Sequence, residues 1–197
     1  MSKAPGSKAP ESKTPGVSPA ALLVFVAASA AISLPARAAL EPGEPVPDFS
    51  AAALQRGHQF PVTLSDALGH GPVVLIFAPA KLAAGCGAGG NALADTVARY
   101  RDYDATVIGV SNDNLGSLRQ LETTGCDTAM PVAADPHQQI ADAFGAQHAV
   151  DSRDALTTYV ITPDGTVLYH DSSPSPDAPA TKAPLAALQD WVARSKP

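Results

Sequence analysis

The chain has 197 residues, of which 45% are hydrophobic, 16% are charged and 5% are aromatic, and its formal net charge at pH 7 is −6. The few basic residues form no tract that would match nucleic-acid phosphates, so this composition disfavours nucleic-acid binding. The five histidines include no pair at metal-ligand spacing and are expected on the surface or in loops.

Residues 1–38 have the layout of a secretory signal peptide with a basic, low-complexity beginning. Lys3, Lys8 and Lys13 precede an apolar stretch over residues 20–34, and an Ala-x-Ala-like cleavage site ends at Ala38. The stretch is shorter than the roughly 20 residues of a membrane span, although an uncleaved anchor is the alternative. Cleavage would leave residues 39–197 as one domain without a stable membrane anchor, in the periplasm or secreted. It would change the formal charge from −6 to −9, because the removed segment carries four basic residues and one acidic residue.

Apolar runs and helical periodicities alternate through the first half of this domain. A fully apolar run over residues 73–77 predicts a central strand buried on both faces. The other expected elements are an extended lead-in over 41–49, a strand over 60–64, a turn at Ser65-Asp66, helices over 91–103 and 115–121, and strands over 106–110 and 130–133.

The second half continues the alternation and ends in a hairpin and a helix. A helix is expected between Asp135-Pro136 and Gly145. Strands over 158–161 and 166–170 flank a turn at Pro163-Asp164-Gly165, and a loop over 172–182 leads to a closing amphipathic helix. The order predicts an α/β domain with a central mixed sheet flanked by helices.

Cys86 stands between the apolar run over 73–77 and the helix expected from residue 91. A thiol at a helix start lies where the helix dipole favours negative charge, which lowers a cysteine pKa and activates a nucleophile. Cys126 is the second cysteine of the chain. Forty residues separate the two, so the sequence leaves open whether they form a disulfide or remain apart.

The order of motifs resembles a thioredoxin-fold peroxiredoxin of the alkyl hydroperoxide reductase and thiol-specific antioxidant family, closest to the bacterioferritin-comigratory type. The resemblance extends from about Gly43 to Trp191. The motifs that carry it are Pro47-Asp48-Phe49, the strand segments over 62–66 and 74–79, Gly85-Cys86, the segment over 108–113 with its Ser-x-Asp end, and the segment over 158–165.

The catalytic motif of that family, Pro-x-x-x-Thr-x-x-Cys, is only partly present. Pro79 and Cys86 match it at the right spacing, whereas Ala83 stands in place of the threonine. The family's arginine lies three residues before the aromatic residue of the late strand, and this position holds Leu156. Arg153, three residues earlier, is the candidate substitute for the missing cation. The resemblance therefore predicts a peroxidase with an atypical site.

The resemblance implies a reaction at sulfur that needs no metal and no bound cofactor. Cys86 would attack hydrogen peroxide or a small alkyl hydroperoxide and become a sulfenic acid. Cys126 would resolve it, or an external thiol would, from a thioredoxin-like protein or a small molecule. Alternatively, Cys126 forms a structural disulfide or is an inert buried thiol. The protein is expected to be a monomer or homodimer.

Two other functional classes remain under consideration. A decayed active site would leave a non-catalytic redox sensor or binding module, which the changes at Ala83 and Leu156 favour. A thioredoxin-like disulfide oxidoreductase is disfavoured, because Gly89 stands where a CxxC motif would have its second cysteine.

Overall fold

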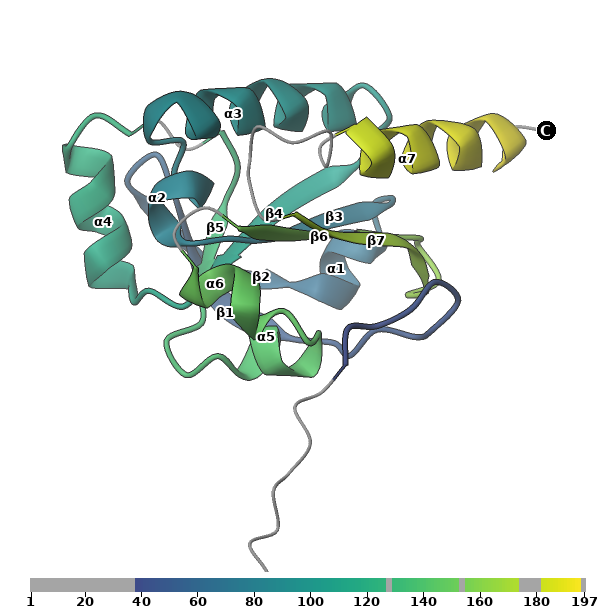
Figure 1. Ribbon diagram of the computed structural model, residues 1–197, viewed down its shortest axis with the longest axis horizontal. Coiled ribbons are helices and arrows are strands. Elements are labelled where there is room, and N and C mark those ends of the chain that lie inside the picture. The colour runs from purple at the N-terminus through teal and green to yellow at the C-terminus, as the bar shows by residue number, and fades with distance from the viewer. Residues whose placement is uncertain (1–37, 127–128, 153–154, 174–181, 196–197) are drawn as a thin grey trace, which may run out of the picture. The chain divides into compact units, whose positions relative to one another are not determined.

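The computed structural model describes residues 38–126, 129–152, 155–173 and 182–195, with the backbone alone over residues 87–91. A seven-stranded sheet in the order β2-β1-β5-β4-β3-β6-β7 forms its centre (Figure 1). Its strands are β1 Ser50–Gln55, β2 His58–Thr63, β3 Val73–Phe77, β4 Thr106–Ser111, β5 Val132–Ala134, β6 Leu156–Ile161 and β7 Val167–Ser173. β3, β4 and β5 pair in parallel, and the other pairs are antiparallel, so the mixed sheet expected from the sequence is confirmed.

Helices cover both faces of the sheet, as Figure 1 shows. The described helices are α1 Leu64–Leu68, α2 Ala80–Ala83, α3 Gly87–Arg101, α4 Leu115–Thr123, α5 Gln139–Ala143, α6 Gln147–Asp151 and α7 Lys182–Ser195. Side chains from α3, α4 and α7 pack into one core cluster, and those from α1, α5 and α6 into another. β3 contributes alternate residues to the two clusters, which explains why all five of its residues are apolar and buried.

Several expected elements need correction. The turn predicted at Ser65-Asp66 is helix α1, whose start is stabilised from a distance: the Asp48 carboxylate accepts bonds from the Ser65 amide (2.9 Å) and hydroxyl (2.8 Å). Strand β1 was not predicted, because its central alanines carry little β preference, and it forms through pairing with β2 and β5. The short helices α2 and α6 were missed as well, and α3 begins at Gly87 rather than at residue 91.

Three further predictions fall partly or wholly outside the described residues. These are the signal peptide, of which only Ala38 is described, the cation at Arg153, and the loop over 172–182, of which residues 174–181 are not described. Among the helices that are described, none is long and apolar enough to cross a membrane.

Candidate active site

Cys86 lies immediately before α3, and the segment between β3 and α3 fixes it there. Pro79 is the N-cap of the short helix α2, with φ −60°, a value that suits proline. After α2 the backbone turns through Gly85, whose φ of +77° favours glycine, and the Cys86 amide donates to the Lys81 carbonyl (2.9 Å). Cys86 is therefore held by backbone bonds, and its side chain is half-buried.

Cys86 is the N-cap residue of α3, a helix of 15 residues. Its sulfur is thus attached at the end of the helix where unpaired amide groups and the helix dipole favour negative charge. The first turn of α3 contains no acidic residue that would oppose a thiolate. Cys86 therefore lies at a helix start, as the sequence predicted.

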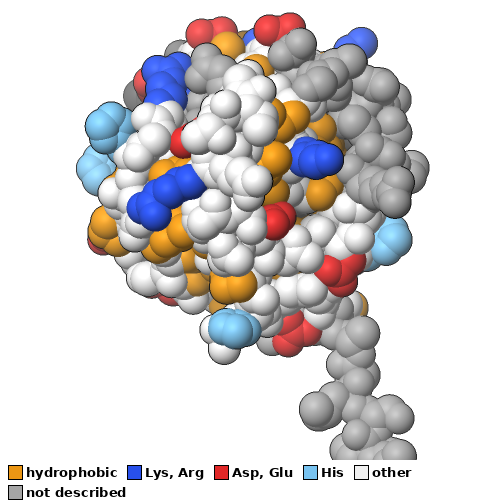
Figure 2. All heavy atoms as spheres, turned by 90° about the vertical axis from the view of Figure 1, so that its left-hand side faces the viewer, with side chains coloured by type: hydrophobic (Ala, Val, Ile, Leu, Met, Phe, Trp, Pro, Cys, Tyr) orange, Lys and Arg blue, Asp and Glu red, His pale blue; other side chains and the backbone are white. Residues whose placement is uncertain are grey.

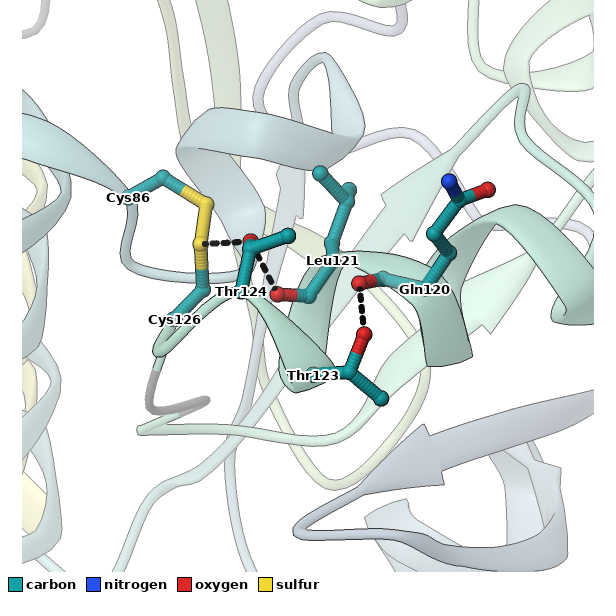
Figure 3. The surroundings of a disulfide bond; sticks show 6 residues. All are labelled: Cys86, Gln120, Leu121, Thr123, Thr124 and Cys126. Carbon is teal, nitrogen blue, oxygen red and sulfur yellow. Dashed lines mark hydrogen bonds between the residues drawn. A yellow bond between two sulfur atoms is a disulfide. The ribbon is translucent and has the colours of Figure 1, made fainter.

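Cys86 and Cys126 form a disulfide, with their Cα atoms 4.9 Å apart (Figure 3). α4 ends at Thr123, and Gly125, with φ +88°, turns the chain so that Cys126 reaches the start of α3. The sequence left open whether the cysteines meet, and the structure joins them. An inert, isolated Cys126 is therefore excluded.

Thr124 is a neighbour of this disulfide that the sequence analysis missed. Its hydroxyl donates to the Leu121 carbonyl (2.6 Å), and its Oγ1 lies 3.5 Å from Cys126 Sγ (Figure 3). Because that hydroxyl hydrogen is already used, a reduced Cys126 thiol would be the donor in this contact. The Thr-Thr-Gly-Cys run at a helix end was the only signal in the sequence for this arrangement.

Ala83 and Leu156 stand where the family resemblance places a threonine and an arginine, and both belong to the core. Ala83 is 2% exposed, and a Cβ built on Gly109 of β4 would lie 3.6 Å from its methyl group. Leu156 is 1% exposed and belongs to the same core cluster. Since Phe77 pairs with Thr157, Leu156 begins β6 just beyond the end of β3, beside the segment that leads to Pro79. Both side chains are therefore apolar core residues close to the segment between β3 and α3.

A cleft of about 790 Å³ lies beside Pro79 and Thr124. Its lining residues come from α2, α4 and the loops after β4 and α6, and they are Pro79, Ala80, Lys81, Asp113, Ser117, Gln120, Leu121, Thr124 and Ser152. Lys81 is the one cation among these lining residues, and its side chain is exposed. Arg153 follows Ser152 but lies outside the described residues, so its expected role stays a prediction.

The described part of the chain contains no group of three His, Cys, Asp or Glu residues that could hold a metal ion. Among the described histidines, His170 stacks on Tyr159, with the ring centroids 5.5 Å apart.

The AhpC/TSA family profile matches residues 42–170. Among solved structures, the chain is similar to peroxidoxin BcpB from Mycobacterium tuberculosis, with 28% identity, a TM-score of 0.58, and coverage of 77% of this chain and 97% of that one. It also resembles AhpC from the same organism (17% identity, TM-score 0.64, coverage 80% and 96%). The mitochondrial 2-Cys peroxiredoxin of Plasmodium falciparum is a further neighbour (14% identity, TM-score 0.61, coverage 77% and 94%).

A search of curated protein sequences gave no significant match. The family match nevertheless covers most of the described domain, and the fold agrees with it. The chain therefore belongs to the AhpC/TSA family and has the thioredoxin-like fold of the peroxiredoxins, which are thiol peroxidases.

Proposed function

We propose that this protein reduces hydrogen peroxide or small alkyl hydroperoxides, with Cys86 as the peroxidatic cysteine and Cys126 as the resolving cysteine. The observation that carries the proposal is the Cys86–Cys126 disulfide at the N-terminus of α3. A disulfide there is the product that such a pair would leave after one turnover.

The first step is attack of the Cys86 thiolate on one peroxide oxygen. A sulfur–oxygen bond forms, the oxygen–oxygen bond breaks, and the second oxygen leaves as water or an alcohol after taking up a proton. Cys86 is then a sulfenic acid. The N-terminal end of α3 favours the thiolate before the attack, because it stabilises negative charge on the sulfur.

The second step is attack of the Cys126 thiolate on the Cys86 sulfur. The new sulfur–sulfur bond is the one in the structure, and the sulfenic oxygen leaves as water after protonation. Two electrons have then passed from the two thiols to the peroxide. An external thiol must return them, so the reaction consumes a thiol reductant.

The apolar residues at two catalytic positions set an expectation for the rate. A preorganised hydrogen-bond donor at a developing negative charge contributes about 10²–10³ in rate. Ala83 and Leu156 offer no such donor, so the rate is expected below that of a site that has both polar groups. Lys81, at the mouth of the neighbouring cleft, and Arg153 are the candidates to supply part of the missing charge.

We also propose that the mature domain acts in the periplasm or outside the cell. Support comes from the basic residues, the apolar stretch and the Ala-x-Ala-like site within residues 1–38. An intramolecular disulfide is compatible with an oxidising compartment. Fractionation of cells that express the full chain, with mass determination of the exported form, tests this point.

The catalytic proposal is tested by mixing the reduced protein with hydrogen peroxide in a stopped-flow instrument. Thiols are alkylated in quenched samples, and the products are identified by mass. At pH 7 the wild type is expected to react at least about tenfold faster than a free thiol, because its thiolate fraction is higher. It should lose both thiols together as the disulfide forms.

Two variants separate the roles of the cysteines. Cys126→Ser should stop at the sulfenic acid, which a dione reagent traps, and Cys86→Ser should react no faster than a free thiol. If the wild type is also no faster than a free thiol, the peroxidase assignment of this site is wrong. The non-catalytic sensor or binding module would then be the better explanation.

A further inference from the structure

A second cleft, of about 580 Å³, reaches the disulfide at Cys126 and does not include Cys86. It is lined by Arg56, Gly57, Arg119, Glu122, Thr123, Gly125 and Cys126. Its volume is in the range of small-molecule sites, which is about 300–1,000 Å³. Figure 2 faces the side of the molecule on which α4 lies, and basic side chains lie there beside hydrophobic ones.

Two hydrogen bonds join α4 to the hairpin of β1 and β2 across this cleft, one donated to α4 and one donated from it. The turn between β1 and β2 consists of Arg56 (φ +49°) and Gly57 (φ +78°), and the Gly57 amide donates to the Glu122 carboxylate on α4 (2.7 Å). In the opposite direction, Arg119 Nη2 donates to Gln59 Oε1 on β2 (2.5 Å). These two bonds connect the turn between β1 and β2, and β2 itself, to α4 across the cleft.

The charge of this cleft is opposite in sign to that of the whole chain. The described residues that line it include two arginines and one glutamate, whereas the chain as a whole carries a formal charge of −6. The glutamate carboxylate already accepts the Gly57 amide. Such a locally basic cleft attracts small anions. A carboxylate suits arginine especially well, because the guanidinium can donate two parallel bonds to it.

We propose that this cleft binds a small anionic thiol, with its carboxylate against Arg56 and Arg119 and its sulfur directed at Cys126. The proposal rests on the function proposed above, since it identifies the reductant class of that reaction. It also predicts which sulfur is attacked, because Cys126 lines the cleft and Cys86 does not.

The ligand would reduce the Cys86–Cys126 disulfide by thiol–disulfide exchange, in two steps. The thiolate of the ligand attacks Cys126 Sγ, a mixed disulfide forms, and the Cys86–Cys126 bond breaks. Cys86 leaves as a thiolate at the N-terminus of α3, where negative charge is favoured, and a low-pKa thiol leaves faster. A second thiolate then attacks the ligand sulfur, which releases the ligand disulfide and the Cys126 thiolate.

The test uses the full, oxidised chain without peroxide, so a failure of the peroxidase proposal does not affect it. The chain is mixed with 3-mercaptopropionate (anionic), 2-mercaptoethanol (neutral) or cysteamine (cationic). For each small thiol, the rate at which protein thiols appear is divided by the rate at which the same small thiol reduces a small uncharged disulfide. This ratio removes differences in the intrinsic reactivity of the three thiols. The anionic thiol is expected to be favoured about three- to tenfold over the neutral one at low salt, which is what one or two exposed charges provide.

Substitutions then assign the preference to the cleft. Arg119→Gln and Arg56→Asn should each reduce it, and both together should abolish it, while reduction by 2-mercaptoethanol stays unchanged. Asn is chosen at position 56 because it tolerates the positive φ. Arg99→Gln, on the exposed surface of α3, is the matched control, and Gln59→Ala removes the partner of Arg119 but keeps its charge. Both controls should keep the preference.

A trapping experiment checks the sulfur that is attacked. After brief exposure to limiting 3-mercaptopropionate and alkylation, tryptic cleavage separates Cys86 (peptide 82–99) from Cys126 (peptide 120–153). The mercaptopropionate adduct is expected on Cys126. An adduct on Cys86, equal corrected rates for the three thiols, or an anionic preference that survives the double arginine variant would overturn the proposal. The proposal would also be overturned if a protein dithiol reduced the disulfide much faster than all three small thiols and at the same rate in the double arginine variant.

Discussion

Leu156 illustrates, at the scale of one residue, how burial constrains a position beside the candidate site. It begins β6 beyond the last residue of β3, at the place where the family resemblance expects an arginine. Its side chain is 1% exposed and packs with Ala78, Ala83 and other apolar residues of one core cluster. Apolar side chains therefore surround this position.

Restoring the family residue at this position should destabilise the protein. Leu156→Arg would bury a guanidinium without a partner, and it is expected to lower the free energy of unfolding by more than about 3 kcal/mol. Leu156→Met conserves volume and should lower it by less than about 1.5 kcal/mol. Urea unfolding of the disulfide form measures both. Wild-type stability in Leu156→Arg would mean that the position opens to water.

The sequence was informative about where individual candidate site residues lie along the chain, but it did not identify their partners in space. Pro79 and Cys86 were predicted from a motif with fixed spacing, and both lie at helix starts in the structure. Thr124 and the pairing of Cys126 could not be predicted, because contacts across forty residues depend on where α4 ends relative to α3. Such placement follows from tertiary packing and not from local pattern.

At the scale of elements, periodicity decided what could be predicted. β3 and β4 were predicted because they are continuous apolar runs, and α4 and α7 because leucines recur at helical spacing. β1 and α2 could not be predicted, because alanine-rich segments carry no periodic signal that distinguishes a strand from a helix. α2 nevertheless matters most for the site, because it connects Pro79 to Cys86.

The turn after α4 gives a prediction at this scale. Gly125 has φ +88°, and a Cβ built there would meet no atom within 4 Å, so the barrier to substitution is conformational only. Gly125→Ala is expected to lower the stability of the reduced protein by about 1 kcal/mol and to slow disulfide formation. Gly125→Asn should lie between alanine and wild type, because asparagine tolerates positive φ.

Urea unfolding of the reduced chains measures the stability effect, and oxidation followed by alkylation and mass measures the disulfide rate. An alanine variant that closes its disulfide as fast as the wild type would show that the turn does not limit the approach of Cys126. The asparagine variant controls for the added side chain, since it differs from alanine in its tolerance of this backbone conformation.

At the scale of the whole molecule, a buried tyrosine anchors each face of the sheet. Tyr159 of β6 accepts a bond from the Leu40 amide (3.1 Å) and donates to the Phe144 carbonyl (2.6 Å), which connects the lead-in, the sheet and the end of α5. Tyr100 of α3 lies in the opposite core cluster and is 1% exposed. Both phenols are therefore removed from water in the folded state.

Burial raises the pKa of both phenols. For Tyr100 burial is the largest cause, and the nearby positive charge of Arg99 offsets only part of it. For Tyr159 burial also dominates, the Leu40 amide acts in the opposite direction, and the carboxylates of Glu41 and Glu44 raise the pKa further. In the unfolded chain both would ionise near pH 10.

This difference predicts a loss of stability in alkaline solution. Above about pH 10 the unfolded chain binds fewer protons than the folded one, so the free energy of unfolding falls as the pH rises, by up to about 1.4 kcal/mol per pH unit for each tyrosine. Below pH 9 both tyrosines are protonated in both states and contribute no slope. Tyr100→Phe should reduce the alkaline slope, by up to about 1.4 kcal/mol per pH unit, and leave the slope between pH 7 and pH 9 unchanged. Urea unfolding of the disulfide form between pH 7 and pH 11 measures both slopes, and an alkaline slope equal to that of the wild type would show that Tyr100 ionises without unfolding.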